Sequence, residues 1–186
     1  MVITIVPVSI SNKKLIEDIK STLFKIFRVN VGTLEINVSA KQFFSKERNQ
    51  YYSTAILEYI IENTIGNLNN YFVVLTELDL YIPALTFIFG EAQYKGRYSI
   101  ISACRLHEEF YTGITNEKLL NERIIKEILH ELGHNFGLNH CIDWDCVMHS
   151  SNSVEEVDIK GNFYCKSCIE ELKKTNPEIR INQYLS

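Results

Sequence analysis

The sequence has no long apolar run, no dense cluster of basic residues and no internal repeat. No segment approaches the roughly 18 consecutive apolar residues that a membrane-spanning helix needs, so we expect no membrane span. The net charge is −4 and the Lys and Arg residues are scattered, which argues against a nucleic-acid-binding surface. The apolar N-terminus lacks the basic segment and the small-residue cleavage site of a signal peptide. We therefore expect a cytoplasmic protein, and we expect it to be a monomer.

A chain of 186 residues fits one domain, or one domain with a small appendage. Strand patterns and helix patterns alternate along its first half, where short apolar segments are followed by apolar residues at helical spacing. The predicted strands are 2–8, 33–39 and 70–77, and the predicted helices between them are 12–27 and 51–65. This order predicts a twisted, mostly parallel sheet with right-handed crossovers.

Two more strands are predicted at 84–92 and 97–106, joined by the short polar link "QYKG". A link this short permits a hairpin, so we expect one of the two to be an antiparallel edge strand in a five-stranded sheet. A long helix is predicted over 115–137, with Thr115 or Asn116 as the residue that caps its start.

The end of this helix divides the chain into two parts. Gly137 is well placed to stop the helix, because glycine tolerates the left-handed conformation in which helices often end. Beyond it the periodicity is lost and cysteine becomes frequent, until a final helix near 166–174 and a tail to Ser186. We therefore expect an α/β fold in which a sheet-and-helix subdomain, 1–137, is followed by a small irregular subdomain, 138–186, stabilised by metal. The two are expected to form one compact unit.

Three of the five histidines lie in the segment "HELGHNFGLNH", residues 130–140. His130 and His134 are four residues apart, so on a helix they lie on one face and can both point a nitrogen at one metal ion. Gly137 allows the chain to reverse, so that His140 can approach the same ion from another direction. Three imidazoles leave the fourth tetrahedral position open, which is typical of a catalytic zinc.

Glu131 is rotated by about 100° from His130 on the helix, so it can reach a water on the metal without being a ligand. Zinc lowers the pKa of a bound water to about 7. Glu131 is then expected to take its proton as general base and to return it to the leaving amine. The sequence therefore predicts a zinc-dependent metallopeptidase. Two alternatives stay open: an amidase with the same machinery, and a non-catalytic, zinc-structured binding module.

Four of the five cysteines form two close pairs, Cys141 with Cys146 and Cys165 with Cys168. In a reducing compartment two such pairs predict a tetrahedral structural zinc site, and disulfides or free thiols are the alternative. The sequence thus predicts two zinc ions per chain, one catalytic and one structural. Cys104 ends a predicted strand alone, and we expect a buried, inert thiol there.

The histidine segment matches the HExxHxxGxxH zinc signature of the metzincin metallopeptidases. Metzincins also have a methionine in a tight turn beneath the metal, and Met148 follows His140 by eight residues. A plain core residue is the alternative for Met148. With Cys141 directly after His140, and with the spacings Cys-x₄-Cys-x-Met and Cys-x₂-Cys, the chain resembles the archaemetzincins. The resemblance implies a metzincin-like fold, a catalytic zinc at the foot of a cleft and a structural zinc nearby.

The expected substrate is a peptide or a small protein, held extended along the antiparallel edge strand. Residues 84–92 are the better candidate for that strand, since Gly90 interrupts their pattern where another backbone could approach closely. Two further polar residues follow the histidine motif. We expect His149 to be solvated rather than a ligand, and Tyr164 to pack with its hydroxyl at the surface rather than to stabilise an oxyanion.

Overall fold

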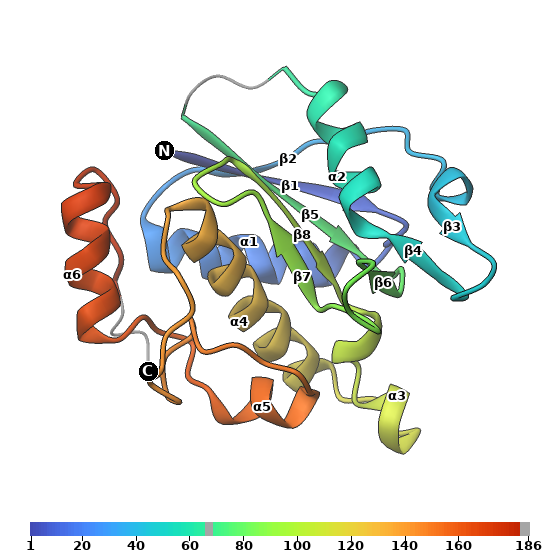
Figure 1. Ribbon diagram of the computed structural model, residues 1–186. Helices are drawn as coiled ribbons and strands as arrows, with labels where there is room; N and C mark the ends of the chain where they lie inside the picture. The colour runs from blue at the N-terminus through green and yellow to red at the C-terminus, as the bar shows by residue number, and fades with distance from the viewer. Residues whose placement is uncertain (66–68, 183–186) are drawn as a thin grey trace.

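The computed structural model describes residues 1–65 and 69–182, and it places a twisted five-stranded sheet between helices (Figure 1). The strands of this sheet are β1 (Val2–Val8), β2 (Val31–Thr33), β5 (Asn70–Thr76), β7 (Gly90–Ala92) and β8 (Tyr98–Ser102). Their order is β2-β1-β5-β8-β7, and every pair is parallel except β7 with β8. The predicted sheet is confirmed, and β7 is its antiparallel edge strand. The end of the predicted tail, 183–186, lies outside the described residues.

Helices cover both faces of the sheet. The helices α1 (Lys13–Phe27) and α4 (Glu117–Asn135) pack on one face, and α2 (Ser53–Glu62) packs on the other (Figure 1). Successive residues of a strand point to opposite faces. Ile5 of β1 therefore lies in the core with α1 and α4, whereas Val6 lies in the core with α2. Burial on both faces explains why the central strands are almost continuously apolar.

Both ends of α4 are determined by single residues. Asn116 caps its start, because the side-chain oxygen accepts a hydrogen bond from the amide of Leu119 at 3.1 Å. Gly137 follows its end with a φ of +94°, in the left-handed region that favours glycine. The amide of Gly137 donates to the carbonyl of His134 at 3.0 Å, so the chain reverses immediately after the helix.

The predicted strand at 33–39 is wrong. β2 ends at Thr33, and no strand is assigned to residues 34–39. The alternating pattern has another cause, because Ile36 and Val38 pack against the core on the α2 side. Alternation of apolar and polar residues indicates that one side of an extended segment is buried, but it does not show that a neighbouring strand pairs with that segment.

A second, three-stranded sheet lies beside the main one, and the sequence does not predict it. It consists of β3 (Phe44–Ser45), β4 (Gln50–Tyr52) and β6 (Leu80–Tyr81), and the short helix η1 (Ala40–Phe43) precedes it. These strands are too short to produce a periodic pattern. β4 also occupies the start of the predicted helix 51–65, so α2 begins only after it.

The chain after Gly137 packs on the α4 side of the sheet and adds to the same core. Its helices are α5 (Val154–Ile159) and α6 (Lys166–Thr175), of which only α6 is predicted from the sequence. The acidic residues of α5 mask a short apolar side formed by Val154 and Val157, both of which are buried. Because this core is shared, the division into 1–137 and 138–186 stays a prediction.

The connection from β8 to α4 contains two short helices, η2 (Cys104–Leu106) and α3 (Glu109–Thr112).

Among the helices of the described chain, none combines the length and the apolar character needed to cross a bilayer.

Candidate metal centres and active-site cleft

A cleft of about 400 Å³ lies against β7, and three parts of the chain line it. Residues 85–92 form one part. Glu127, Glu131 and two histidines from α4 form the second. The third part is His140 with residues 150–152. The cleft therefore brings the predicted histidines and Glu131 together at the antiparallel edge strand.

Each helical histidine has one ring nitrogen bonded to a backbone carbonyl. The Nδ1 atom of His130 lies 2.8 Å from the oxygen of Val147, and that of His134 lies 2.9 Å from the oxygen of Leu138. A carbonyl can only accept, so both Nδ1 atoms carry the proton and both Nε2 atoms keep a free lone pair. The two Nε2 atoms are 3.1 Å apart. With no proton between them they do not form a hydrogen bond, and both are available to a metal ion.

His140 completes this group. Its ring centroid lies 5.3 Å from that of His130 and 4.9 Å from that of His134. One nitrogen from each of the three rings lies within 4.8 Å of the others. Burial lowers the pKa of all three imidazoles, and the ammonium of Lys160 lowers it further. Neutral imidazole is the form that ligates zinc, so the donor set and its electrostatics fit this metal.

Glu131 lies in the cleft wall between α4 and β7. It is 5% exposed, burial raises the pKa of its carboxyl well above the usual value, and Lys160 opposes that shift. A Cβ atom on Gly90 would lie 2.7 Å from Oε1 and 2.8 Å from Cγ of Glu131. Gly90 therefore leaves room for the Glu131 side chain on this face of β7, and the approach of another backbone at the strand edge stays a prediction.

Gly133 in the middle of α4 makes room for the turn that carries Met148. A Cβ atom there would overlap Sδ of Met148 and would lie 3.0 Å from its Cε and 3.1 Å from Cε1 of Tyr164. Met148 is fully buried. A glycine in the helix interior costs about 1 kcal/mol relative to alanine. The close packing of Met148 gives the physical reason for it.

The four clustered cysteines bring their sulfur atoms within 4.8 Å of one another. The Sγ atoms of Cys141 and Cys165 are 3.7 Å apart, and so are those of Cys146 and Cys168. A disulfide needs about 2.05 Å. Four sulfurs placed about 2.3 Å from a tetrahedral zinc lie about 3.8 Å from each other, so the spacing fits zinc. The contact with the Cys168 sulfur and the amide of Cys165, which donates to Sγ of Cys146 at 3.3 Å, lower the pKa of Cys146 to about 5, and this favours the thiolate that binds metal.

The cysteine cluster is joined to the histidine group through the backbone. The amide of Val147 donates to the carbonyl of Phe163 at 2.8 Å, and the carbonyl of Val147 is the acceptor for His130. The amide of Cys141 donates to the carbonyl of Met148 at 2.9 Å. One short segment therefore contacts both groups.

Tyr164 does not have the exposed hydroxyl that the sequence indicates. The side chain is buried, and the hydroxyl donates to the carbonyl of Leu129 in α4 at 2.6 Å. Since the preference of tyrosine for the surface is only an average, this interior contact had no signal in the sequence. His149 stacks on Trp144 with ring centroids 4.0 Å apart, and in the described chain it belongs to neither metal-binding group.

Two charged residues at the cleft have no place in the motif. Lys160 is 1% exposed, and its Nζ atom lies 2.8 Å from Oε1 of Glu127, which lines the cleft. Glu127 precedes Glu131 by one helical turn, so its position on the same face could have been read from the sequence. Nothing in the local sequence of Lys160 indicates burial. Cys104 stands apart from the cluster and is only partly buried, not fully buried as expected, and this burial raises the pKa of its thiol to about 11.

Known proteins match both the sequence and the fold. Peptidase family M54 matches residues 28–174. The archaemetzincin of Methanocaldococcus jannaschii is 35% identical over 175 residues, which cover 93% of each chain. That of Pyrococcus horikoshii is 41% identical over 134 residues, which cover 70% of each chain.

Solved structures of archaemetzincins have the same fold as this chain. The archaemetzincin of Methanopyrus kandleri has a TM-score of 0.81 and 32% identity, and the match covers 94% of each chain. The malonate complex of the Archaeoglobus fulgidus archaemetzincin has a TM-score of 0.78 and 35% identity, and the match covers 92% of this chain and 99% of that one. With a histidine group and a cysteine group that each fit zinc, the chain belongs to the archaemetzincins, the zinc metallopeptidases of peptidase family M54.

Proposed function

We propose that His130, His134 and His140 hold the catalytic zinc and that Glu131 is the general base for hydrolysis of peptide bonds. The observation that carries this proposal is the pair of unprotonated Nε2 atoms, 3.1 Å apart, in a cleft that Glu131 also lines. A zinc ion held there would polarise the scissile carbonyl and acidify a water molecule.

Glu131 takes the proton of the attacking water and delivers it to the leaving amine. Val147 and Leu138 keep the two helical imidazoles in the tautomer that leaves Nε2 bare, through the bonds to Nδ1. Gly90 leaves the space in which the Glu131 carboxylate lies. An intact carboxylate at this position has no use in a pure binding module, which favours the peptidase over the non-catalytic alternative.

We propose that the substrate lies extended along the outer edge of β7. The amide of Gln93, which follows β7, donates to Tyr98 at 3.0 Å, on the β8 side. Because backbone groups alternate in direction along a strand of an antiparallel pair, the amide of Ala92 points away from β8. Ala92 also lines the cleft, so this amide is available to a peptide there.

We propose that Cys141, Cys146, Cys165 and Cys168 hold the structural zinc, and that Met148 and Gly137 support the catalytic group from below and from the end of α4. The sulfur spacing of 3.7 Å supports the first assignment. The burial of Met148 and the left-handed φ of Gly137 support the second. In this proposal zinc stabilises residues 138–186 as a C-terminal subdomain, and residues 1–137 are the N-terminal subdomain, which ends with the active-site helix.

A cytoplasmic location and a monomeric state complete the proposal. Zinc-binding thiols need a reducing compartment, which supports the cytoplasm. Both candidate metal groups draw all their ligands from one chain, which supports a monomer that acts on peptides or small proteins.

The central test compares Glu131→Gln with His134→Ala. Elemental analysis should find two zinc ions in Glu131→Gln and one in His134→Ala. Hydrolysis of a fluorogenic peptide library should fall by about 10²–10⁴-fold in Glu131→Gln, the usual contribution of a general base. Glu122→Gln, an exposed residue of the same helix, is the matched control and should be fully active. Loss of zinc from Glu131→Gln with retention in His134→Ala would reverse the two roles.

A further inference from the structure

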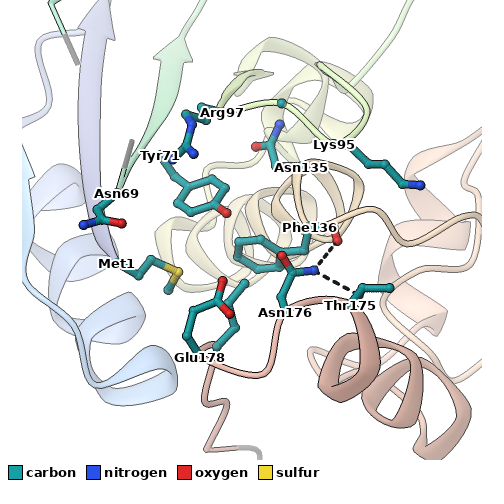
Figure 2. Close-up of a pocket in the computed structure, with 12 residues that line it drawn as sticks. Met1, Asn69, Tyr71, Lys95, Arg97, Asn135, Phe136, Thr175, Asn176 and Glu178 are labelled. Atoms are coloured by element: carbon teal, nitrogen blue, oxygen red, sulfur yellow. Dashed lines mark hydrogen bonds between the residues drawn. The ribbon is translucent and has the colours of Figure 1, made fainter. Parts of the chain in front are cut away.

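A second cavity, of about 580 Å³, lies at the C-terminal end of α4 (Figure 2). It is lined by the starts of β1 and β5, the turn between β7 and β8, the end of α4 and the residues that follow α6. Among the described residues it shares none of its lining with the active-site cleft. Its volume is that of an ordinary small-ligand site.

Asn135 supplies a buried acceptor to this cavity. Its side chain is 3% exposed, and Nδ2 donates to the carbonyls of Gln93 and Tyr98, both at 3.0 Å. Two acceptors on one side fix the orientation of the amide, so Oδ1 must face the other way. Oδ1 is buried and has no donor among the described residues, and in Figure 2 it points toward the side of Tyr71 and Arg97. A buried acceptor of this kind needs a donor, which a ligand in the cavity can supply.

Opposite charges stand around the same cavity. Arg97 is half-buried, and its guanidinium lies 5.7 Å from the centre of the Tyr71 ring. Burial raises the pKa of Tyr71, Arg97 lowers it and Glu178 raises it, and all three residues line the cavity. Within the described parts of the chain neither Arg97 nor Glu178 forms an ion pair with another residue.

The floor of the cavity is aromatic. The rings of Tyr71 and Phe136 meet edge to face with centroids 5.0 Å apart, and both line the space. Asn176 is held at the rim because its Nδ2 donates to the carbonyl of Phe136 at 2.6 Å. The cavity thus combines an unpaired cation, a buried acceptor, an apolar floor and an unpaired carboxylate.

We propose that this cavity binds a short peptide of two or three residues with free ends and an apolar last residue. The C-terminal carboxylate pairs with Arg97, and the last backbone N–H donates to Oδ1 of Asn135. The apolar side chain lies on Tyr71 and Phe136, and the free ammonium faces Glu178. A phosphate or a simple carboxylic acid matches Arg97 but has no N–H donor for Asn135. This site does not depend on the roles proposed for the histidines and Glu131.

Calorimetric titration of leucyl-leucine into the zinc-loaded full chain tests the proposal, with Glu131→Gln as background to prevent turnover. Arg97→Gln should weaken binding roughly tenfold or more, because a charge-assisted hydrogen bond is lost. Arg180→Gln, an exposed arginine outside the cavity, is the matched control and should bind within about twofold of the background. On the background protein itself, leucyl-leucinamide lacks the carboxylate and should also bind roughly tenfold more weakly.

Three results would overturn the assignment. Absence of leucyl-leucine binding up to about 10 mM would remove the site altogether. Equal affinities of the Arg97→Gln and Arg180→Gln proteins would put the peptide elsewhere, including in the catalytic cleft. Equal affinities for leucyl-leucine and leucyl-leucinamide would contradict carboxylate recognition, and this comparison stands even if Arg97→Gln does not fold.

Discussion

Replacing Gly133 by alanine should destabilise the protein, although the same change at an exposed helical position stabilises. Helix propensity alone would raise the free energy of unfolding by about 1 kcal/mol. The new Cβ would overlap Sδ of Met148 and would stand 3.0 Å from its Cε, well inside the usual carbon contact of about 3.5–4.0 Å. Met148 is fully buried, so the surrounding core leaves its side chain little room to move. Overpacking costs typically about 1–3 kcal/mol. We expect a net loss of up to about 2 kcal/mol after the propensity gain.

Urea unfolding of the zinc-loaded protein, followed by circular dichroism at fixed free zinc, measures this change. Met148→Ala alone should cost about 2–5 kcal/mol by leaving a cavity. In the Met148→Ala background the overlap with Sδ and Cε is gone and the contact with Cε1 of Tyr164 at 3.1 Å remains, so the second change should cost less than in the natural sequence or should stabilise. The double-mutant cycle should therefore give a coupling of about 1–3 kcal/mol. Additive effects of the two substitutions would refute the steric argument.

Three other substitutions test the cleft and the cysteine cluster. Gly90→Ala puts a methyl group 2.7 Å from Oε1 of Glu131, so peptide hydrolysis should fall about 10–100-fold with zinc content unchanged, and an unaltered kcat would contradict the contact. Ala92→Pro removes an outward amide of β7 and should weaken binding of a peptide inhibitor roughly tenfold, whereas Ala92→Ser keeps that amide and is the control. Equal inhibition constants for the two variants would exclude binding of the substrate along the edge of β7. Cys165→Ser should accelerate limited proteolysis within 138–186 by about tenfold or more, and Cys104→Ser should not; matching digestion patterns would mean that the cluster is misassigned.

The features that the sequence predicts well are those encoded by local spacing. The i, i+4 histidines, the Asn116 cap and the left-handed Gly137 follow from the geometry of one helix and its end. The parallel character of the main sheet follows from the alternation of strand and helix patterns, and its antiparallel edge strand follows from the short link between the last two strands.

The features that it does not predict depend on partners far away in the chain. β4 pairs with β6, and two residues of register carry no periodic signal. Lys160, which follows α5, is buried beside its ion-pair partner Glu127 of α4. The reason for Gly133 is likewise the side chain of Met148, which arrives from a later turn. Helix and strand periodicity describe which side of a segment is buried, but they do not say against what.

Val147 gives the two metal groups a thermodynamic connection. It lies between Cys146 and Met148, its amide is bonded to Phe163, and its carbonyl orients the ring of His130. A zinc ion on the four thiols would restrict the motion of Val147. The histidine group would then lose less conformational entropy when it binds its own zinc ion. Linkage is reciprocal, so we expect each zinc to raise the affinity for the other by the same factor. As free zinc falls, activity should then decline more steeply than a one-site binding curve, and the peptidase would be switched off over a narrow range of zinc concentration.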